Sequence, residues 1–114
     1  MKRAYLEPLY HLLPQHEARL RVTLEVERGR LLGWAVQLEW LDPEEGRFVW
    51  VARYDTAGGT PHRDRNRIAA HEPVDLPQDP GKAARVARAD LAERAEEYIK
   101  AYRAAKAQGK EAWP

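Results

Sequence analysis

The sequence predicts an α+β fold in which an antiparallel meander of three to four strands packs against one long C-terminal helix. Three observations lead to it: alternation of apolar and polar residues from 20 to 40, short turns between the alternating runs, and three- to four-residue periodicity near the C-terminus. A chain of 114 residues is long enough for one hydrophobic core but not for two. We therefore expect a single domain over residues 1–114.

The composition is typical of a globular protein, with 44% hydrophobic and 32% charged residues. A net charge of +1 provides no overall basic field, so nucleic-acid or membrane binding would need a local patch. The absence of cysteine excludes disulfides, thiolate metal sites and a thiol nucleophile, and it fits a cytoplasmic location. No apolar run approaches the roughly 20 residues of a membrane span, so we expect no membrane partner. Arginine outnumbers lysine, which fits a thermophile or a GC-rich genome.

Residues 1–17 are interrupted by prolines and are expected to form a lead-in that packs against the domain. The sheet follows within residues 18–72. Strict apolar–polar alternation indicates its first strand over residues 20–26 and its second over residues 32–40. Glycine and proline between the runs indicate short turns, and short turns favour antiparallel neighbours.

The segment RFVWVARY, residues 47–54, predicts a third strand that is apolar on both faces at its start. Such a strand is typically central, or its second face meets a partner. Uninterrupted alternation would place Arg53 and Asp55 on the face opposite Trp50 and Tyr54.

The face that carries Arg53 would also carry Val49 and Val51, and we regard it as a candidate homodimer surface. A fourth strand is expected to begin near His62 and to run towards Ala70. A proline-rich connection then leads to the C-terminal helix.

The helix is expected over residues 79–108. Asp79 and Pro80 fit its N-cap and first position, and Gly109 fits its end. One buried stripe is predicted by its small and apolar residues, which are Ala84, Ala87, Leu91, Ala95, Tyr98, Tyr102 and Ala105. A helix of roughly 28 residues would be about 42 Å long, whereas the strands would span about 20–30 Å. We therefore expect the helix to overhang the sheet, to kink or to contact a partner.

The stretch RYDTAGGTPHRDR, residues 53–65, gathers arginines, aspartates and a histidine around a pair of glycines, and it is the strongest candidate site in the sequence. Its glycine pair permits positive φ and the close approach of a backbone or a ligand. Three arginines at alternate positions of the return strand would stand about 6.6 Å apart, close to the phosphate spacing of an extended nucleic-acid strand. Such arginines also form solvated strand edges. The candidate binding residues are Gly58, Gly59, Arg63, Asp64, Arg65 and Arg67.

A catalytic interpretation makes His62 a general acid–base, with Asp55 or Asp64 orienting its ring and Arg53 or Arg63 stabilising a phosphoryl transition state. A variant makes His62, Asp64 and His71 the start of a divalent metal site. No dense cluster of histidines and carboxylates completes that site in the sequence, so we expect neither a metal nor another cofactor. The structural alternatives are that Asp55 caps the glycine turn and that His62 is a hydrogen-bonded structural residue.

The run from Tyr54 to Asp64 resembles a signature of small uncharacterised prokaryotic proteins, which reads Arg-Tyr-Asp-Thr-Ala-His-Gly-x-x-His-Arg-Asp. The likeness extends to Ala89-Asp90-Leu91 and Tyr98 in the helix. That family has no established activity, so the resemblance implies a fold unit and no mechanism. A looser similarity links the strand end and the following histidine to RNA-targeting toxins of toxin–antitoxin modules.

This chain departs from the signature at Gly58, where the family has a histidine. One half of a two-histidine pair is therefore missing, which favours a binding or structural role. The sequence thus indicates a small cytoplasmic binding protein whose 53–67 hairpin binds RNA or another anionic ligand. A metal-independent ribonuclease-like toxin that acts through His62 is the second interpretation, and a purely structural dimerisation domain is the third.

Overall fold

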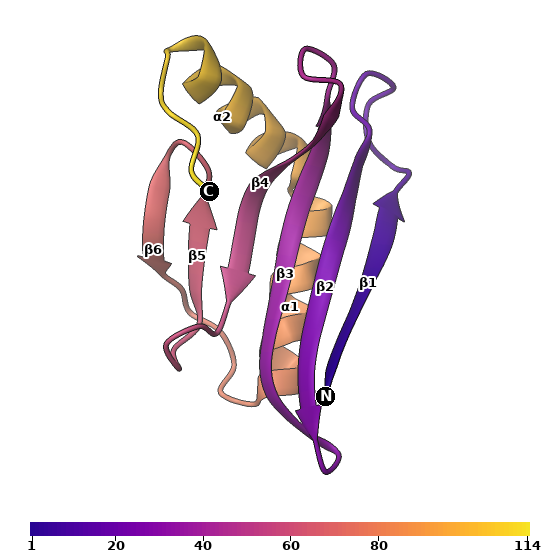
Figure 1. The fold of residues 1–114 in the computed structure, drawn as a ribbon, viewed down its shortest axis with the longest axis vertical. Coiled ribbons are helices and arrows are strands. Elements are labelled where there is room, and N and C mark those ends of the chain that lie inside the picture. Colours follow the sequence, from indigo (N-terminus) through magenta and orange to yellow (C-terminus); the bar gives the residue numbers. More distant parts are fainter.

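The computed structural model describes residues 1–114 as one antiparallel sheet with two helices on one of its faces (Figure 1). The six strands are neighbours in chain order, which confirms the α+β class and the antiparallel meander. The predicted number of three to four strands is wrong. The strands are β1 (Lys2–Leu9), β2 (Ala18–Glu27), β3 (Arg30–Asp42), β4 (Arg47–Asp55), β5 (His62–Arg65) and β6 (Ala69–Pro73).

Both additional strands lie at the edges of the sheet. Eight residues of the expected lead-in form β1, which pairs with β2 from Lys2 opposite Glu25 to Leu9 opposite Ala18. The residues of β1 are mostly exposed, so its sequence lacks the alternation of a half-buried strand. The expected fourth strand is in fact two strands, β5 and β6, because the chain turns back after Arg65.

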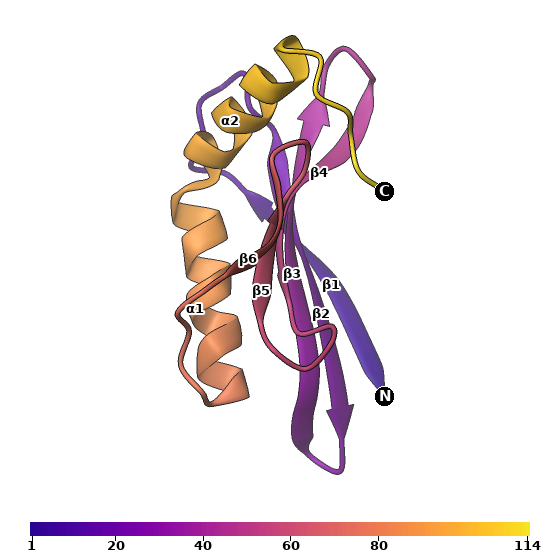
Figure 2. The ribbon, with the colours of Figure 1, turned by 90° about the vertical axis from the view of Figure 1, so that its left-hand side faces the viewer.

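The helices are α1 (Pro80–Glu93) and α2 (Ala95–Ala107), and they cover one face of the sheet (Figure 2). The predicted single helix over residues 79–108 is wrong, because the helical conformation is interrupted at Arg94. Arg94 has φ −103° and ψ 18°, yet its N–H still donates to the carbonyl of Asp90. The expected kink is therefore confirmed, as is the N-cap at Asp79. Neither helix is long and apolar enough to cross a membrane.

The core lies between the helices and the sheet face that they cover. The predicted helical stripe is confirmed, except that Ala83 is buried and Ala84 is half-buried. The sheet contributes alternate residues of β2, β3 and β4, among them Leu20, Val36 and Leu38. Because the helices cover only one face, the other face of the sheet remains open for contacts.

A β-bulge in β4 changes the face on which its residues lie. Leu38 pairs with Ala52 and Glu39 pairs with Trp50, so Val51 has no partner on β3. Trp50 therefore lies on the open face with Arg53, whose guanidinium is 4.3 Å from the Trp50 ring centroid. The prediction that these two residues lie on opposite faces is wrong.

The bulge also changes the expected dimer surface. Val49 and Val51 are 6% and 2% exposed and belong to the core beneath the helices. Neither valine is available for contact with a second copy, so this choice of surface was wrong. A homodimer remains a prediction without an assigned surface.

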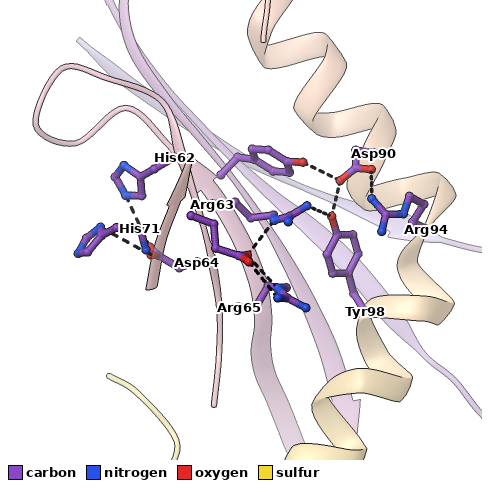
Figure 3. A network of polar contacts seen from close by, with 10 residues as sticks. His62, Arg63, Asp64, Arg65, His71, Asp90, Arg94 and Tyr98 are labelled. Atoms are coloured by element: carbon purple, nitrogen blue, oxygen red, sulfur yellow. Dashed lines mark hydrogen bonds and ion pairs between the residues drawn. The ribbon is translucent and has the colours of Figure 1, made fainter. Parts of the chain in front are cut away.

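A polar network joins the helices to the sheet at the helix kink (Figure 3). The Asp90 carboxylate accepts hydrogen bonds from the hydroxyls of Tyr54 on β4 and Tyr98 on α2, and from Arg94 Nη1. Burial raises the pKa of Asp90, but these three hydrogen bonds outweigh it and hold the pKa below its ordinary value. Arg63 on β5 donates in turn to the Tyr98 hydroxyl at 3.0 Å.

We expect Asp90→Asn to lower the free energy of unfolding by about 2 kcal/mol at pH 7, because charge-assisted hydrogen bonds are lost. A carboxylate whose pKa is depressed by folding stabilises the protein above its unfolded pKa, and this contribution is lost as the pH falls through the folded pKa. The deficit of the variant should therefore shrink below about pH 4. Denaturant unfolding from pH 7 to pH 2 measures it.

Glu93→Gln provides the matched control, since Glu93 is an exposed acid only three residues away. Its unfolding free energy should stay within about 0.5 kcal/mol of the wild type, as is usual for surface substitutions. A pH-independent deficit in Asp90→Asn would contradict the assigned role of the carboxylate.

Candidate functional site

An open hollow of about 570 Å³ lies on the uncovered face of the sheet, where β4, β5 and β6 meet the β4–β5 loop. The side chains of Arg53, Asp55, His62, Asp64 and His71 line it. We call these five residues the hollow cluster. The first four are among the predicted site residues, and the structure brings them together.

The strand register explains this gathering. In the β4–β5 ladder, Asp55 is opposite His62 and Arg53 is opposite Asp64, so all four side chains project from the same face. The loop between the strands turns through Gly58 and Gly59 at φ +83° and +96°, which confirms the positive φ predicted for the glycine pair. Gly58 lines the hollow.

Both ring nitrogens of His62 lie near oxygen atoms. Nε2 is 3.2 Å from Asp55 Oδ1 and 3.6 Å from Asp64 Oδ2, and Nδ1 is 3.3 Å from the Thr60 carbonyl oxygen. The His62 side chain is 15% exposed, so it is accessible from the hollow rather than sealed in the core. A general acid–base must reach its substrate with a ring nitrogen. Neither nitrogen of His62 is directed at the open space in this arrangement.

The backbone holds the two carboxylates in place. Asp55 Oδ1 accepts from the N–H of Ala57 at 2.9 Å, so the predicted turn cap is confirmed. Asp64 Oδ1 accepts from the N–H of His71 at 2.7 Å, although His71 has φ +52°. Asp64 is 6% exposed, and the turn after β5 folds back over it.

The guanidinium of Arg53 lies between the two carboxylates. Nε is 3.5 Å from Asp55 Oδ2, and Nη2 is 3.5 Å from Asp64 Oδ2. Its one hydrogen bond is long, from Nη1 to Gln37 Oε1 at 3.4 Å. Nε is buried and lacks a hydrogen-bond partner. Arg53 therefore balances charge in the hollow cluster without saturating its donors.

Arg63 and Arg65 lie on the other face of β5 and point towards the helices (Figure 3). Both donate to Glu72 on β6, Arg63 Nε at 3.0 Å and Arg65 Nε at 2.8 Å. The hydrogen bond from Arg65 contributes most to lowering the pKa of Glu72, and Arg63 adds to it against the effect of burial. Burial lowers the pKa of Arg63, but the bond to Glu72 and nearby Tyr98 raise it overall. The guanidinium groups of Arg63 and Arg65 therefore already have hydrogen-bond partners within the protein.

Arg67 lies beyond the end of β5, in the turn to β6, at φ +70°. It donates to the Lys110 carbonyl at 2.5 Å, and its guanidinium is 5.2 Å from the Tyr102 ring centroid. The expected row of three arginines on one strand is therefore wrong. The alternation within β5 instead separates Arg63 and Arg65 from the hollow cluster.

The centre of the open face carries residues that the sequence reasoning did not select. Arg19 on β2 lies over the ring of Phe48 on β4, with 3.7 Å between guanidinium carbon and ring centroid. Arg19 and Arg21 both donate to Glu39, at 2.7 and 2.9 Å. Trp50 extends this surface towards Arg53. The signal in the sequence was the third strand's apolar residues on both faces, but the bulge concealed which face held the tryptophan.

The C-terminal tail reaches the same face after passing the end of β5 (Figure 2). The backbone N–H of Trp113 donates to the side chain of Asn66, and Trp50 Nε1 donates to the Trp113 carbonyl at 3.2 Å. The two indole rings lie 6.4 Å apart. The open face thus has an aromatic centre beside a polar hollow.

A family model described as "Domain of unknown function (DUF7718)" matches residues 2–108. It therefore covers every helix and strand of the structure, including both edge strands that the sequence reasoning missed. Neither a curated protein nor a solved structure matches the chain. The likeness to RNA-targeting toxins stays an interpretation of the sequence.

We expect His71→Gly to keep or raise the unfolding free energy, by up to about 1 kcal/mol, because glycine adopts φ +52° without the strain of a side chain. The N–H that donates to Asp64 is retained in this variant. Denaturant unfolding measures the change. His71→Ala is the control, since it removes the imidazole but keeps the Cβ; equal destabilisation in both variants would contradict the strain argument.

Proposed function

Because the chain belongs to the DUF7718 family, whose function is unknown, we propose its role from geometry: it binds single-stranded nucleic acid across the open face of the sheet. The observation that carries this proposal is the pairing of rings and guanidinium groups along β4, Arg19 over Phe48 and Arg53 over Trp50. Bases stack on aromatic rings and on the planes of guanidinium groups such as those that lie over these two rings, and guanidinium groups also bind phosphates through paired hydrogen bonds.

The charges at the centre of the open face support this role. Arg19 and Arg21 share one carboxylate, that of Glu39, so one positive charge is left uncompensated. Burial raises the pKa of Glu39, but hydrogen bonds from both arginines and from Gln37 outweigh it and lower the pKa. The Arg21 side chain is 44% exposed and therefore accessible to a phosphate. A local patch of this kind is what a protein of net charge +1 requires.

The spacing along β4 also suits an extended strand. Phe48 and Trp50 are two residues apart on the same face, which corresponds to about 7 Å. Trp113 widens the aromatic surface beside Trp50. A nucleic-acid strand that follows β4 from Phe48 would reach Arg53 and then the hollow cluster.

One observation favours cleavage of RNA as a second candidate function. The His71 side chain is 78% exposed, and its ring centroid lies 4.8 Å from that of His62 at the edge of the hollow. His71 would accept the proton of a 2′-hydroxyl, whose oxygen then forms a bond to the adjacent phosphorus while the bond to the 5′-oxygen breaks. The 5′-oxygen takes up a proton, and a 2′,3′-cyclic phosphate results. His71 thus replaces His62 in the acid–base role of the sequence interpretation.

We expect Arg21→Gln to weaken binding of a fluorescein-labelled single-stranded RNA 15-mer by about threefold to tenfold, because one phosphate contact is lost. The slope of log affinity against log salt should become shallower by about one unit. Fluorescence anisotropy at several salt concentrations measures both quantities. A DNA 15-mer of the same sequence tests whether binding requires the 2′-hydroxyl.

Arg30→Gln is the matched control, because it removes the same charge from the exposed start of β3, away from the aromatic centre. It should leave the salt slope almost unchanged. Equal affinities of the wild type, Arg21→Gln and Arg30→Gln would contradict binding across the open face, as would the absence of binding at low salt.

If the second candidate function holds, the wild type cleaves the RNA 15-mer and leaves the DNA 15-mer intact, because DNA lacks the attacking hydroxyl. Denaturing gel electrophoresis detects the products. His71→Gly should abolish cleavage while it keeps the fold and the affinity for the oligonucleotide. Intact RNA after prolonged incubation with the wild type would leave binding as the function and exclude cleavage.

A further inference from the structure

We infer that Asp55, His62, Asp64 and His71 bind a divalent transition-metal ion, for which Zn²⁺ is the natural probe. The inference goes beyond the proposed binding of nucleic acid and does not depend on it. It is an alternative to the proton-accepting role of His71, because the one nitrogen lone pair of a neutral imidazole cannot bind a metal ion and a proton together. It also departs from the sequence expectation of no metal. The register of β4 and β5 brings Asp55 to His62, and the turn after β5 brings His71 to Asp64, so the structure adds Asp55 to the three residues that the sequence offered as the start of a metal site.

The first argument concerns lone pairs. The Nδ1 atom of His62 faces the Thr60 carbonyl oxygen, which can only accept a hydrogen bond, so the ring proton belongs on Nδ1. Nε2 then presents a lone pair to Asp55 Oδ1 and Asp64 Oδ2, which are themselves electron-rich. Arg53, whose Nη2 lies 3.5 Å from Asp64 Oδ2, relieves only part of the repulsion among these three atoms, and a positive charge among them would remove it. A proton on Nε2 forms a hydrogen bond mainly with one of the two oxygens, whereas a metal ion is coordinated by all three atoms.

The second argument is the separation of the candidate ligand atoms. A tetrahedral zinc site with bonds of about 2.0–2.1 Å has ligand atoms roughly 3.3 Å apart. His62 Nε2 lies 3.2 Å from Asp55 Oδ1 and 3.6 Å from Asp64 Oδ2. Candidate ligand atoms of His62, Asp64 and His71 all lie within 4.8 Å of one another. The exposed His71 side chain, whose Nδ1 lies 3.8 Å from Asp64 Oδ1, has room to turn its ring towards the fourth position.

The third argument is that the candidate ligands are already oriented. A histidine that binds a metal usually donates its second ring N–H to a carbonyl or carboxylate, as the contact of His62 with Thr60 provides. Backbone N–H groups of Ala57 and His71 hold the two carboxylates. Less reorganisation is then needed when the ion binds.

The charge balance favours a cation and the ligand set favours a transition metal. Two carboxylates face one guanidinium in the hollow cluster, so with neutral imidazoles a negative charge remains. Imidazole ligands suit zinc and neighbouring metals, whereas magnesium prefers oxygen ligands and retains water. A bound divalent ion would reverse the charge of the hollow and make it attractive to a phosphate. The ion would lie at the end of the path that a nucleic-acid strand takes when it follows β4.

The test is isothermal titration calorimetry of the untagged, EDTA-treated and dialysed full chain with ZnCl₂, with MgCl₂ titrated separately. We expect one equivalent of zinc to bind and magnesium to bind far more weakly. His62→Gln and His71→Gly should each lower zinc affinity by more than about a hundredfold, since even a lost supporting hydrogen bond costs about 10- to 100-fold. The visible spectrum of the Co²⁺-loaded protein should show the intense bands of a tetrahedral site.

His11→Gln is the matched control, because it removes an imidazole on the β1–β2 connection, far from the hollow. It should bind zinc as the wild type does. His71→Gly keeps the test decisive if His62→Gln fails to fold. Absence of zinc binding by the wild type, or equal affinity of the wild type and His71→Gly, would overturn the proposal.

The metal site and the nucleic-acid proposal can fail separately. Zinc binding is measured without nucleic acid, and Arg21→Gln should retain it in full. One-equivalent zinc binding without affinity for the 15-mer would support the metal site alone. RNA binding by a protein that binds no zinc would overturn the metal site and leave the open-face proposal standing.

Discussion

The structure depends most on the contact between the Asp90 carboxylate and the hydroxyls of Tyr54 and Tyr98. A strand, a helix kink and the second helix meet at this half-buried acid, and Arg63 connects it to the β5–β6 hairpin. Three donors offset the cost of its partial burial. They tie the helix kink to β4, while burial of the apolar faces of the helices and the sheet determines which face stays open.

Alternate residues of β5 lie on opposite faces of the sheet, so one charged segment contributes both to the contacts with the helices and to the hollow cluster. Arg63 and Arg65 face the helices, where both form ion pairs with the single carboxylate of Glu72 and Arg63 donates to the Tyr98 hydroxyl. His62 and Asp64 face the other way and meet the charged end of β4. The arginines that contact Glu72 and Tyr98 and two residues of the hollow cluster therefore lie on one strand, and a change in the register of β5 would disrupt both sets of contacts.

Much of this fold could be predicted from the sequence where one face of an element is buried. The alternation of β2 and β3 and the helical stripe were clear for that reason, because burial imposes the period. The edge strand β1 carries no such pattern, since its side chains are mostly exposed. The sequence predicts that charged side chains gather at the hairpin containing His62 and Asp55, and the structure brings them to one hollow; their function stays a prediction. His71 was harder to place, because its approach to Asp64 depends on a turn at Arg67 with an unusual backbone conformation.

The single unpaired residue Val51 has a consequence for how this protein tolerates insertions and deletions. The aromatic start of β4 and its charged end share a face only because the strand is out of phase by one residue between them. Deleting that residue would restore a regular ladder and leave both halves of the strand on their present faces. If the residue stayed but the ladder became regular, Phe48 and Trp50 would face the helices, or Arg53 and Asp55 would. Loss of one residue at this position should therefore preserve the open face, whereas loss of the bulge at constant length would not.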